Sequence, residues 1–154
     1  MDASHLELKN QICFPFYSVS RLITKAYKPF LSKLGLTYPQ YLVLMVLWEA
    51  DGISVNQIKE KLLLDTNTLS PLLKRIEAMG LITRLRSKAD ERSVIVSLTE
   101  EGVKLKTKAL PIPEKMLENL SAEGIEIDEI AGLRTMLNNW MKILSKNNDQ
   151  NENK

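Results

Sequence analysis

The residues with the most specific chemistry in this 154-residue chain are one cysteine and three tyrosines near its start. Cys13 is the only cysteine, and Tyr17, Tyr27 and Tyr38 follow it. A single cysteine forms no disulfide within its own chain, so its oxidation leads to a sulfenic acid or to a mixed disulfide with another thiol. The sequence therefore indicates a thiol switch at Cys13.

A second chemical signal is the concentration of positive charge between Ser70 and Arg92. The whole chain has a net charge of only +2, but six basic and three acidic residues give this segment a net +3. The basic residues are Lys74, Arg75, Arg84, Arg86, Lys88 and Arg92. Local positive charge of this kind binds the phosphates of a nucleic acid, whereas the charge of the whole chain indicates nothing.

An N-terminal helix is predicted to position Cys13 and the first tyrosines. Ser4 and Glu7 have the spacing of a capping box, which indicates a helix start. Because Pro15 lacks an amide hydrogen and its ring crowds the preceding turn, this helix is expected to kink or restart close to Cys13. Apolar residues from Phe16 onward recur every three or four positions, which predicts one continuous buried stripe.

The basic segment follows a pattern typical of a winged helix-turn-helix. A strongly apolar core helix is predicted over 37–50, and two short helices follow it, capped by Ser54 and Asp65. Residues 81–86 and 93–98 alternate apolar and polar side chains, which predicts two strands joined by a polar turn. A charged hairpin after two short helices is a wing.

The C-terminal part is predicted to contain two helical regions and a tail. Thr99 caps a helix that should break around Leu110, because Pro111 and Pro113 follow. Between Ile130 and Leu144, apolar residues at three- and four-residue steps form a seam that needs a partner helix. The asparagine-rich residues 145–154 are expected to be disordered.

Composition excludes several other classes of protein. A chain with 44% hydrophobic and 26% charged residues is typical of a folded, soluble protein. The start of the chain has no leader pattern and no apolar run is long enough for a bilayer, so we expect a cytoplasmic protein without a membrane partner. The sequence has no metal-binding motif, phosphate-binding loop or nucleophile elbow, so we expect no metal, no cofactor and no enzyme.

Several strings of residues resemble those of MarR-family winged-helix repressors, over a match from Leu8 to about Leu144. They are Leu36-Thr37-Tyr38-Pro39-Gln40-Tyr41, Leu69-Ser70-Pro71-Leu72-Leu73-Lys74-Arg75, Asp90-Glu91-Arg92-Ser93 and Leu98-Thr99-Glu100-Glu101-Gly102. Within that family, Asn10-Gln11-Ile12-Cys13-Phe14 and Tyr27-Lys28-Pro29 resemble the single-cysteine organic hydroperoxide sensors, the OhrR branch. Pro15 departs from that branch, which usually has an aliphatic residue at this position.

The resemblance implies a mainly α fold with a small β-wing, assembled as an intertwined homodimer on a pseudo-palindromic double-stranded DNA operator. Its divisions would be an N-terminal dimerisation helix (1–34), a winged helix-turn-helix domain (35–99), C-terminal dimerisation helices (100–144) and a disordered tail (145–154). Such a protein is a repressor that leaves its operator in response to oxidative stress.

The resemblance also implies which residues contact DNA. The recognition helix would enter the major groove with Asn67, Thr68, Ser70, Lys74 and Arg75. In the wing, Arg86 and Lys88 would contact DNA and Arg92 would reach the minor groove. Asp90 would hold the guanidinium group of Arg92 in a fixed position.

By the same resemblance, Cys13 is the thiol that reacts with organic hydroperoxide. Tyr17, Tyr27 and Tyr38 would be the phenols around it, some of them contributed by the other subunit, with Phe14, Phe16 and Phe30 as an apolar lining. Oxidation to a sulfenic acid, followed by a mixed disulfide with a low-molecular-weight thiol, would displace the tyrosines and release the DNA.

Other interpretations remain open from the sequence alone. A lone cysteine is more often an inert core residue than a reactive one. The alternative for the tyrosines is that they are ordinary core residues, and the alternative for Arg84 and Arg86 is that they are charges on a strand surface. A MarR-family regulator that responds to a small ligand, or acts globally with Cys13 as a modulator, is one alternative function. A thiol peroxidase that turns over repeatedly with a reductant is the other.

Overall fold

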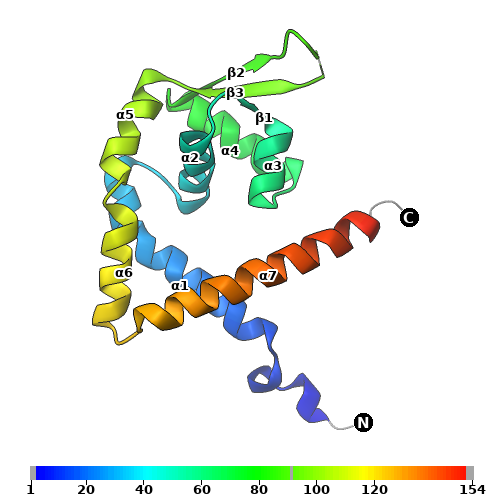
Figure 1. Cartoon of the computed structure of the whole chain (residues 1–154), viewed down its shortest axis with the longest axis vertical. Helices are drawn as coiled ribbons and strands as arrows, with labels where there is room; N and C mark the ends of the chain where they lie inside the picture. Colours follow the sequence, from blue (N-terminus) through cyan, green and yellow to red (C-terminus); the bar gives the residue numbers. More distant parts are fainter. Residues whose placement is uncertain (1–2, 91, 152–154) are drawn as a thin grey trace.

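The computed structural model describes residues 3–90 and 92–151 (Figure 1). Two 3₁₀ helices, Ala3–Leu6 and Leu8–Asn10, precede the first long helix, and a third, Ser32–Leu34, follows it. The α-helices are α1 (Cys13–Leu31), α2 (Tyr38–Glu49), α3 (Val55–Leu62), α4 (Thr66–Ala78), α5 (Glu100–Ala109), α6 (Ile112–Ala122) and α7 (Ile127–Asn151). The strands are β1 (Ile53–Ser54), β2 (Ile82–Arg86) and β3 (Val94–Leu98).

Helices α2, α3 and α4 and the three strands form a winged helix-turn-helix, which confirms the predicted fold class. The sheet is antiparallel with the order β1-β3-β2, and Arg84 of β2 lies opposite Val96 of β3. The two-residue strand β1 was not predicted, because so short a segment has no alternation to detect. It pairs Ile53 with Val96 and so fixes the base of the wing to the start of α3.

The hydrophobic core lies within this winged-helix unit. Its largest fully buried side chains come from α1, α2, α3, α4, β2 and β3, and they are Leu31, Val43, Leu44, Leu47, Ile58, Leu69, Leu73, Ile76, Ile82 and Val96. The predicted core helix is α2, which is buried on several sides and begins with a capping box between Thr37 and Gln40. At the base of the wing, a Cβ on Gly102 would lie 2.1 Å from the carbonyl oxygen of Leu81, so α5 approaches the residue before β2 as closely as only glycine allows.

Helices α1, α6 and α7 extend away from the winged-helix unit, and both ends of the chain lie on the same side of the molecule (Figure 1). Few of their side chains are buried: Leu31 in α1 and Ile112 and Met116 in α6, with none among residues 127–146 of α7. Phe16 of α1 packs edge-on against Trp140 of α7, with 5.3 Å between the ring centroids. These helices therefore form an arm rather than a second core.

Three predictions about the ends of the chain need comment. The first helix was expected to begin at Ser4, but the segment before Cys13 forms short 3₁₀ helices and α1 begins at Cys13. The expected restart near Cys13 is confirmed, and Pro15 fits there because the first turn of a helix has no need of its amide hydrogen. The predicted disordered tail from Ser145 is wrong up to Asn151, where α7 ends. Residues 152–154 of that tail lie outside the described residues.

The continuation of α7 has a physical reason. Each residue added to an existing helix gains one backbone hydrogen bond without a new nucleation step, so polar residues can extend a helix that they would not start.

The predicted break around Leu110 is present, since α5 ends at Ala109 and α6 begins at Ile112. In the described part of the chain no single helix is both long and apolar enough to cross a membrane, although Cys13–Leu34 and Tyr38–Glu49, bent by 71°, pass that test as a pair.

Candidate thiol sensor and nucleic-acid interface

The recognition helix α4 has one buried face and one exposed face. Leu69, Leu73 and Ile76 are buried against the core, at the three- and four-residue spacing of a single helix face. All five side chains predicted to contact DNA from this helix are exposed: Asn67, Thr68, Ser70, Lys74 and Arg75. The packing of α4 on the core therefore presents amide, hydroxyl and cationic groups together to solvent, which are the groups that contact bases and phosphates.

The predicted wing residues Arg86, Lys88, Asp90 and Arg92 are also exposed and lie on the hairpin between β2 and β3. The carboxylate of Asp90 accepts a hydrogen bond from the backbone amide of Arg92 at 3.0 Å. We expected Asp90 to hold the guanidinium group of Arg92, but the ion pairs found among the described residues do not include this one. Asp90 thus shapes the turn through the backbone. Its neighbour Glu91, part of the quoted wing string, lies outside the described residues.

Arg84 is a basic wing residue whose charge is already matched within the chain. The carboxylate of Glu77, in the last turn of α4, accepts hydrogen bonds from Nε of Arg84 at 3.0 Å and from Nη2 at 2.6 Å. It also accepts one from the backbone amide of Arg84 at 3.1 Å. These hydrogen bonds and the positive charge of Arg84 lower the pKa of Glu77. Arg84 therefore joins the wing to the recognition helix, and this favours the interpretation of Arg84 as a structural charge.

A small cavity brings residues of the two predicted DNA-binding elements together. It has a volume of about 230 Å³ and lies between α3, α4 and the wing. Ser70 of α4 lines it together with Arg84 and Arg92 of the wing. The structure therefore places Ser70 and Arg92 on one side of the molecule, although they are 22 positions apart in the chain.

Two of the three predicted phenols form a cluster at the junction of α1 and α2. The rings of Tyr27 and Tyr38 have centroids 4.9 Å apart, and Tyr41 lies 6.2 Å from Tyr27 and 6.5 Å from Tyr38. Burial raises the pKa of all three, and for Tyr27 and Tyr41 their tyrosine neighbours raise it further. At neutral pH the three phenols are therefore protonated and able to donate hydrogen bonds.

Cys13 and Tyr17 lie at the other end of α1. Cys13 is the first residue of this helix and is exposed, and Tyr17 follows one turn later on the same face. The hydroxyl of Tyr17 accepts a hydrogen bond from Nη1 of Arg21 at 2.8 Å, and the guanidinium carbon of Arg21 lies 5.5 Å from the ring centroid. At 1.5 Å per residue, Cys13 is about 21 Å from Tyr27 along the helix axis. One chain therefore does not bring Cys13 to the Tyr27 and Tyr38 pair.

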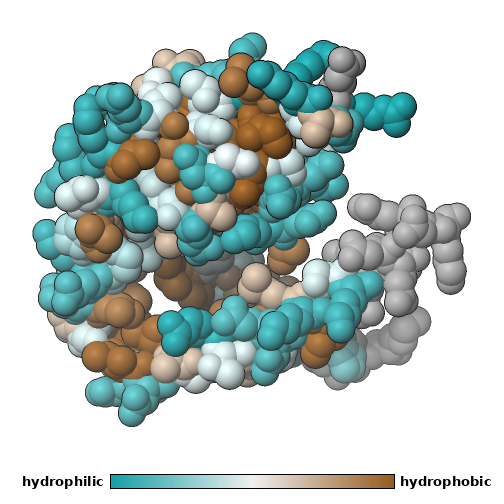
Figure 2. Space-filling view, turned by 45° about the horizontal axis from the view of Figure 1, so that its top comes forward, coloured by the Kyte–Doolittle hydropathy of each residue, from teal (hydrophilic) through white to brown (hydrophobic). Residues whose placement is uncertain are grey.

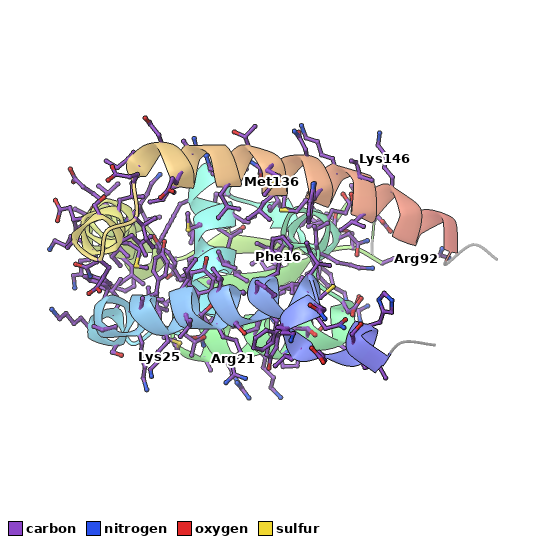
Figure 3. All side chains as sticks on the ribbon, turned by 90° about the horizontal axis from the view of Figure 1, so that it is seen from below. Phe16, Arg21, Lys25, Arg92, Met136 and Lys146 are labelled. Atoms are coloured by element: carbon purple, nitrogen blue, oxygen red, sulfur yellow. The ribbon has the colours of Figure 1, made fainter. Side chains whose placement is uncertain are left out.

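Sequence reasoning missed two side chains of these sites. Tyr41 completes the tyrosine cluster, and its place one helical turn after Tyr38 was the available signal. Arg21 donates a hydrogen bond to Tyr17 at i, i+4 spacing on α1. Arg21 and Lys25 point away from α7 on the outer side of α1, whereas Phe16 points toward α7, where Met136 lies (Figure 3).

A helix-turn-helix with a basic hairpin, carried between long terminal helices, defines a winged-helix regulator of transcription. The family of transcriptional regulators SarA/Rot matches residues 25–109. The organic hydroperoxide resistance transcriptional regulator of Bacillus subtilis is 50% identical over 86% of this chain and 91% of its own length. The chain belongs to the MarR family of winged-helix transcriptional regulators.

Two solved structures have the same arrangement. AbfR is a protein of Staphylococcus epidermidis. The structure of reduced AbfR bound to DNA superimposes on this chain with a TM-score of 0.76 at 37% identity, covering 94% of this chain and 99% of AbfR. The apo form of MarR from E. coli superimposes with a TM-score of 0.68 at 25% identity, covering 84% of this chain and 96% of MarR. The resemblance found in the sequence is thus confirmed.

Proposed function

We propose that this protein is a DNA-binding transcriptional repressor that senses organic hydroperoxides through oxidation of Cys13 and then leaves its operator. The observation that carries the proposal is the position of Cys13, which is exposed at the first residue of a helix whose outer side is largely unpacked. The 50% identical relative of Bacillus subtilis is named for organic hydroperoxide resistance. Reduced AbfR, 37% identical, is bound to DNA in its structure.

The proposal includes a homodimer, because the terminal helices have apolar surfaces that a single chain leaves exposed. On α1, Phe14, Tyr17, Val19 and Leu22 are between 41% and 65% exposed. On α7 the exposed apolar side chains include Leu133, Met136, Trp140, Met141, Ile143 and Leu144. Hydrophobic side chains also reach the surface around the hollow between the winged-helix unit and the arm formed by α1, α6 and α7 (Figure 2). Apolar surface of this extent indicates an interface.

A dimer also offers a way to complete the sensor. If α1 packs against α1 of a second copy in the opposite direction, Cys13 of one subunit approaches Tyr27 and Tyr38 of the other. Protonated phenols there would donate hydrogen bonds to a thiolate or to the sulfenate formed from it. This arrangement would bring Cys13 and Tyr17, near the start of α1, to Tyr27, near the end of α1, and Tyr38, at the start of α2.

The proposed chemistry has two steps. The Cys13 thiolate attacks the outer oxygen of the hydroperoxide, the O–O bond breaks and a sulfenic acid forms, while the alkoxide that leaves takes a proton from water and becomes an alcohol. A low-molecular-weight thiol then attacks the sulfenic sulfur, and a mixed disulfide forms with loss of water. The bulky adduct at the subunit interface would change the spacing of the two winged-helix units, so that the dimer no longer fits both half-sites.

The proposed DNA contacts follow the exposed faces of α4 and the wing. Asn67, Thr68 and Ser70 lie near the start of α4 and are suited to base edges, whereas Lys74 and Arg75 are suited to phosphates. Of the wing cations, Arg86, Lys88 and Arg92 remain as proposed contacts. Asp90 orders the turn that carries Arg92.

A gel-shift experiment tests this function. The probe is the DNA upstream of the protein's own gene, treated with cumene hydroperoxide and a small thiol, and intact mass reports the state of Cys13. We expect the reduced protein to bind, the treated protein to release the probe as the adduct appears, and Cys13→Ser to bind under both conditions. Release of the probe by Cys13→Ser at the wild-type peroxide concentration would exclude Cys13 as the trigger. Wild-type protein that carries the adduct and still binds would exclude release by oxidation.

A further inference from the structure

Gln40 is a buried polar side chain that joins the tyrosine cluster to the recognition helix. It lies in the first turn of α2, two residues after Tyr38, and is 6% exposed. Among the described residues, Gln40 is the one polar side chain buried in this core. Burial of an amide costs free energy unless hydrogen bonds compensate, so the partners of Gln40 indicate what it does.

The partners of Gln40 lie in two different elements. Its carbonyl oxygen accepts hydrogen bonds from the backbone amide of Thr37 at 2.8 Å and from the hydroxyl of Thr37 at 3.0 Å. Its amide nitrogen donates to the sulfur of Met79 at 3.7 Å, 39 positions further along the chain. Gln40 therefore connects the start of α2 to the residue that caps the C-terminus of α4.

The end of α4 is in turn connected to the wing. Glu77, two residues before Met79, holds the backbone and guanidinium group of Arg84 in β2. The hydroxyl of Thr99 donates to the carbonyl oxygen of Gly80 at 2.6 Å. Met79 therefore lies between Glu77 and Gly80, the two residues at the end of α4 that are bonded to β2 and to the start of α5.

The contact between Gln40 and Met79 is a weak hydrogen bond between two elements that are distant in the chain. A thioether sulfur is a weak hydrogen-bond acceptor, so loss of this bond costs less than loss of a bond to a carbonyl oxygen. The hydrogen bonds of Gln40 to Thr37 are short and local, so Gln40 moves with the first turn of α2. That turn also carries Tyr38, whose ring contacts Tyr27 of α1.

We propose that Gln40 is a positioning residue that transmits displacement of Tyr38 to the recognition helix through Met79. The proposal rests on the function proposed above, in which the Cys13 adduct displaces the tyrosines. It adds a defined path through one buried amide, from the first turn of α2 to the last turn of α4 and, through Glu77 and Arg84, to the wing.

The test compares three variants with the wild-type protein on the upstream DNA probe, before and after treatment with cumene hydroperoxide and a small thiol. Met79→Leu removes the sulfur acceptor with little change in volume, and Gln40→Leu removes the amide. Met45→Leu is the matched control, because it makes the same methionine-to-leucine change on α2 at a side chain that is 37% exposed and is not among the hydrogen-bond partners of Gln40. Intact mass and thermal unfolding are measured for each variant.

We expect the reduced forms of Met79→Leu and Gln40→Leu to bind the probe within about threefold of the wild-type affinity. The loss of affinity on oxidation, about tenfold or more in the wild-type protein and in Met45→Leu, should fall below threefold in Met79→Leu and Gln40→Leu. The yield of the Cys13 adduct should be unchanged. A purely structural role for Gln40 would weaken the reduced and oxidised forms equally and would leave their ratio unaltered.

Three results would overturn the proposal. A wild-type ratio of affinities in Met79→Leu and Gln40→Leu, with normal adduct yield, excludes the path through Met79 and leaves the proposed function intact. A normal ratio in Met79→Leu alone shows that the sulfur contact transmits nothing. Wild-type protein that forms the adduct and does not release DNA overturns the proposed function, and the proposed coupling fails with it.

Discussion

The winged-helix unit and the terminal helices of this protein differ in how much of their apolar surface a single chain buries. In the winged-helix unit, α2, α3, α4 and the sheet bury a continuous core that includes Leu44, Ile58 and Leu73. In α7, no side chain between residues 127 and 146 is buried, and Trp140 packs on Phe16 while still 39% exposed. One chain thus completes the core of the winged-helix unit, whereas α7 keeps an exposed apolar surface that the proposed homodimer would cover.

The largest expected effect is in the core of the complete unit. Leu44→Ala removes a side chain that is 0% exposed, and it should lower the free energy of unfolding by about 2–5 kcal/mol. Leu85→Ala is the matched control, because Leu85 lies on the wing and is 70% exposed; its effect should stay within about 0.5 kcal/mol. Chemical denaturation measures both values. Equal effects at the two positions would remove the distinction between a packed unit and an open surface.

The next effect is on assembly of the arm. Trp140→Ala removes an aromatic side chain from the apolar surface of α7 and should raise the dissociation constant of the dimer by about tenfold to 100-fold. Sedimentation velocity over a range of protein concentrations measures this constant. Lys146→Ala, on the same helix, should leave it unchanged. A Trp140→Ala protein that dimerises as tightly as the wild type would place the interface elsewhere.

A smaller effect separates two arginines of the wing. Arg92→Ala should lower the slope of log affinity against log salt concentration by about 0.9, because the proposed interface loses one cation that neutralises DNA charge. Arg84→Met should leave this slope unchanged, since the charge of Arg84 is matched by Glu77 within the chain. Fluorescence anisotropy with the upstream DNA at several salt concentrations gives both slopes. A lower slope for Arg84→Met would mean that Arg84 contacts phosphate directly.

The smallest expected effect is on the pH dependence of stability. The folded protein holds the pKa of Glu77 below its ordinary value, so the Glu77 carboxylate stabilises the fold at neutral pH. This contribution disappears as the pH falls below the ordinary range of carboxyl groups and through the lowered pKa of the folded state. Glu77→Gln should therefore lower the Tm at pH 7 by less than Leu44→Ala does, and the difference from the wild type should shrink in acid.

Glu118→Gln, on α6, is the control for that measurement, since it removes one surface carboxylate without touching the wing. A difference between Glu77→Gln and wild type that stays constant from neutral to acidic pH would contradict the assigned role of the ion pair. A difference that grows in acid would have the wrong sign for a carboxylate with a lowered pKa.

Sequence patterns predicted the elements well where the signal was local. The capping residues Ser54 and Asp65 placed the starts of α3 and α4, and the alternation in β2 and β3 placed the wing, because both signals depend only on neighbouring residues. The same reasoning placed the break between α5 and α6 at its two prolines. It failed at β1, which is held only by pairing with β3, and at the end of α7, where an existing helix continues through polar residues.

The candidate site likewise has features that the sequence predicted and features that depend on contacts between distant residues. The identity of Cys13 as the thiol and the basic content of α4 and the wing were read from residue types alone. The sequence left Arg84 as either a DNA contact or a strand charge, and only the distances to Glu77 favour the second interpretation. It also predicted that Asp90 would hold the guanidinium of Arg92, whereas the folded turn directs this carboxylate to a backbone amide.

Residue types and periods of a few positions were enough to specify most of the helices, the wing, the single thiol and the family. The packing of distant segments was needed to show that Tyr41 joins Tyr27 and Tyr38, that Gln40 contacts Met79, and that α1 holds Cys13 far from the tyrosine pair. Contacts between distant positions depend on how helices pack against one another. That packing is set by the summed burial of many side chains, which no local pattern contains.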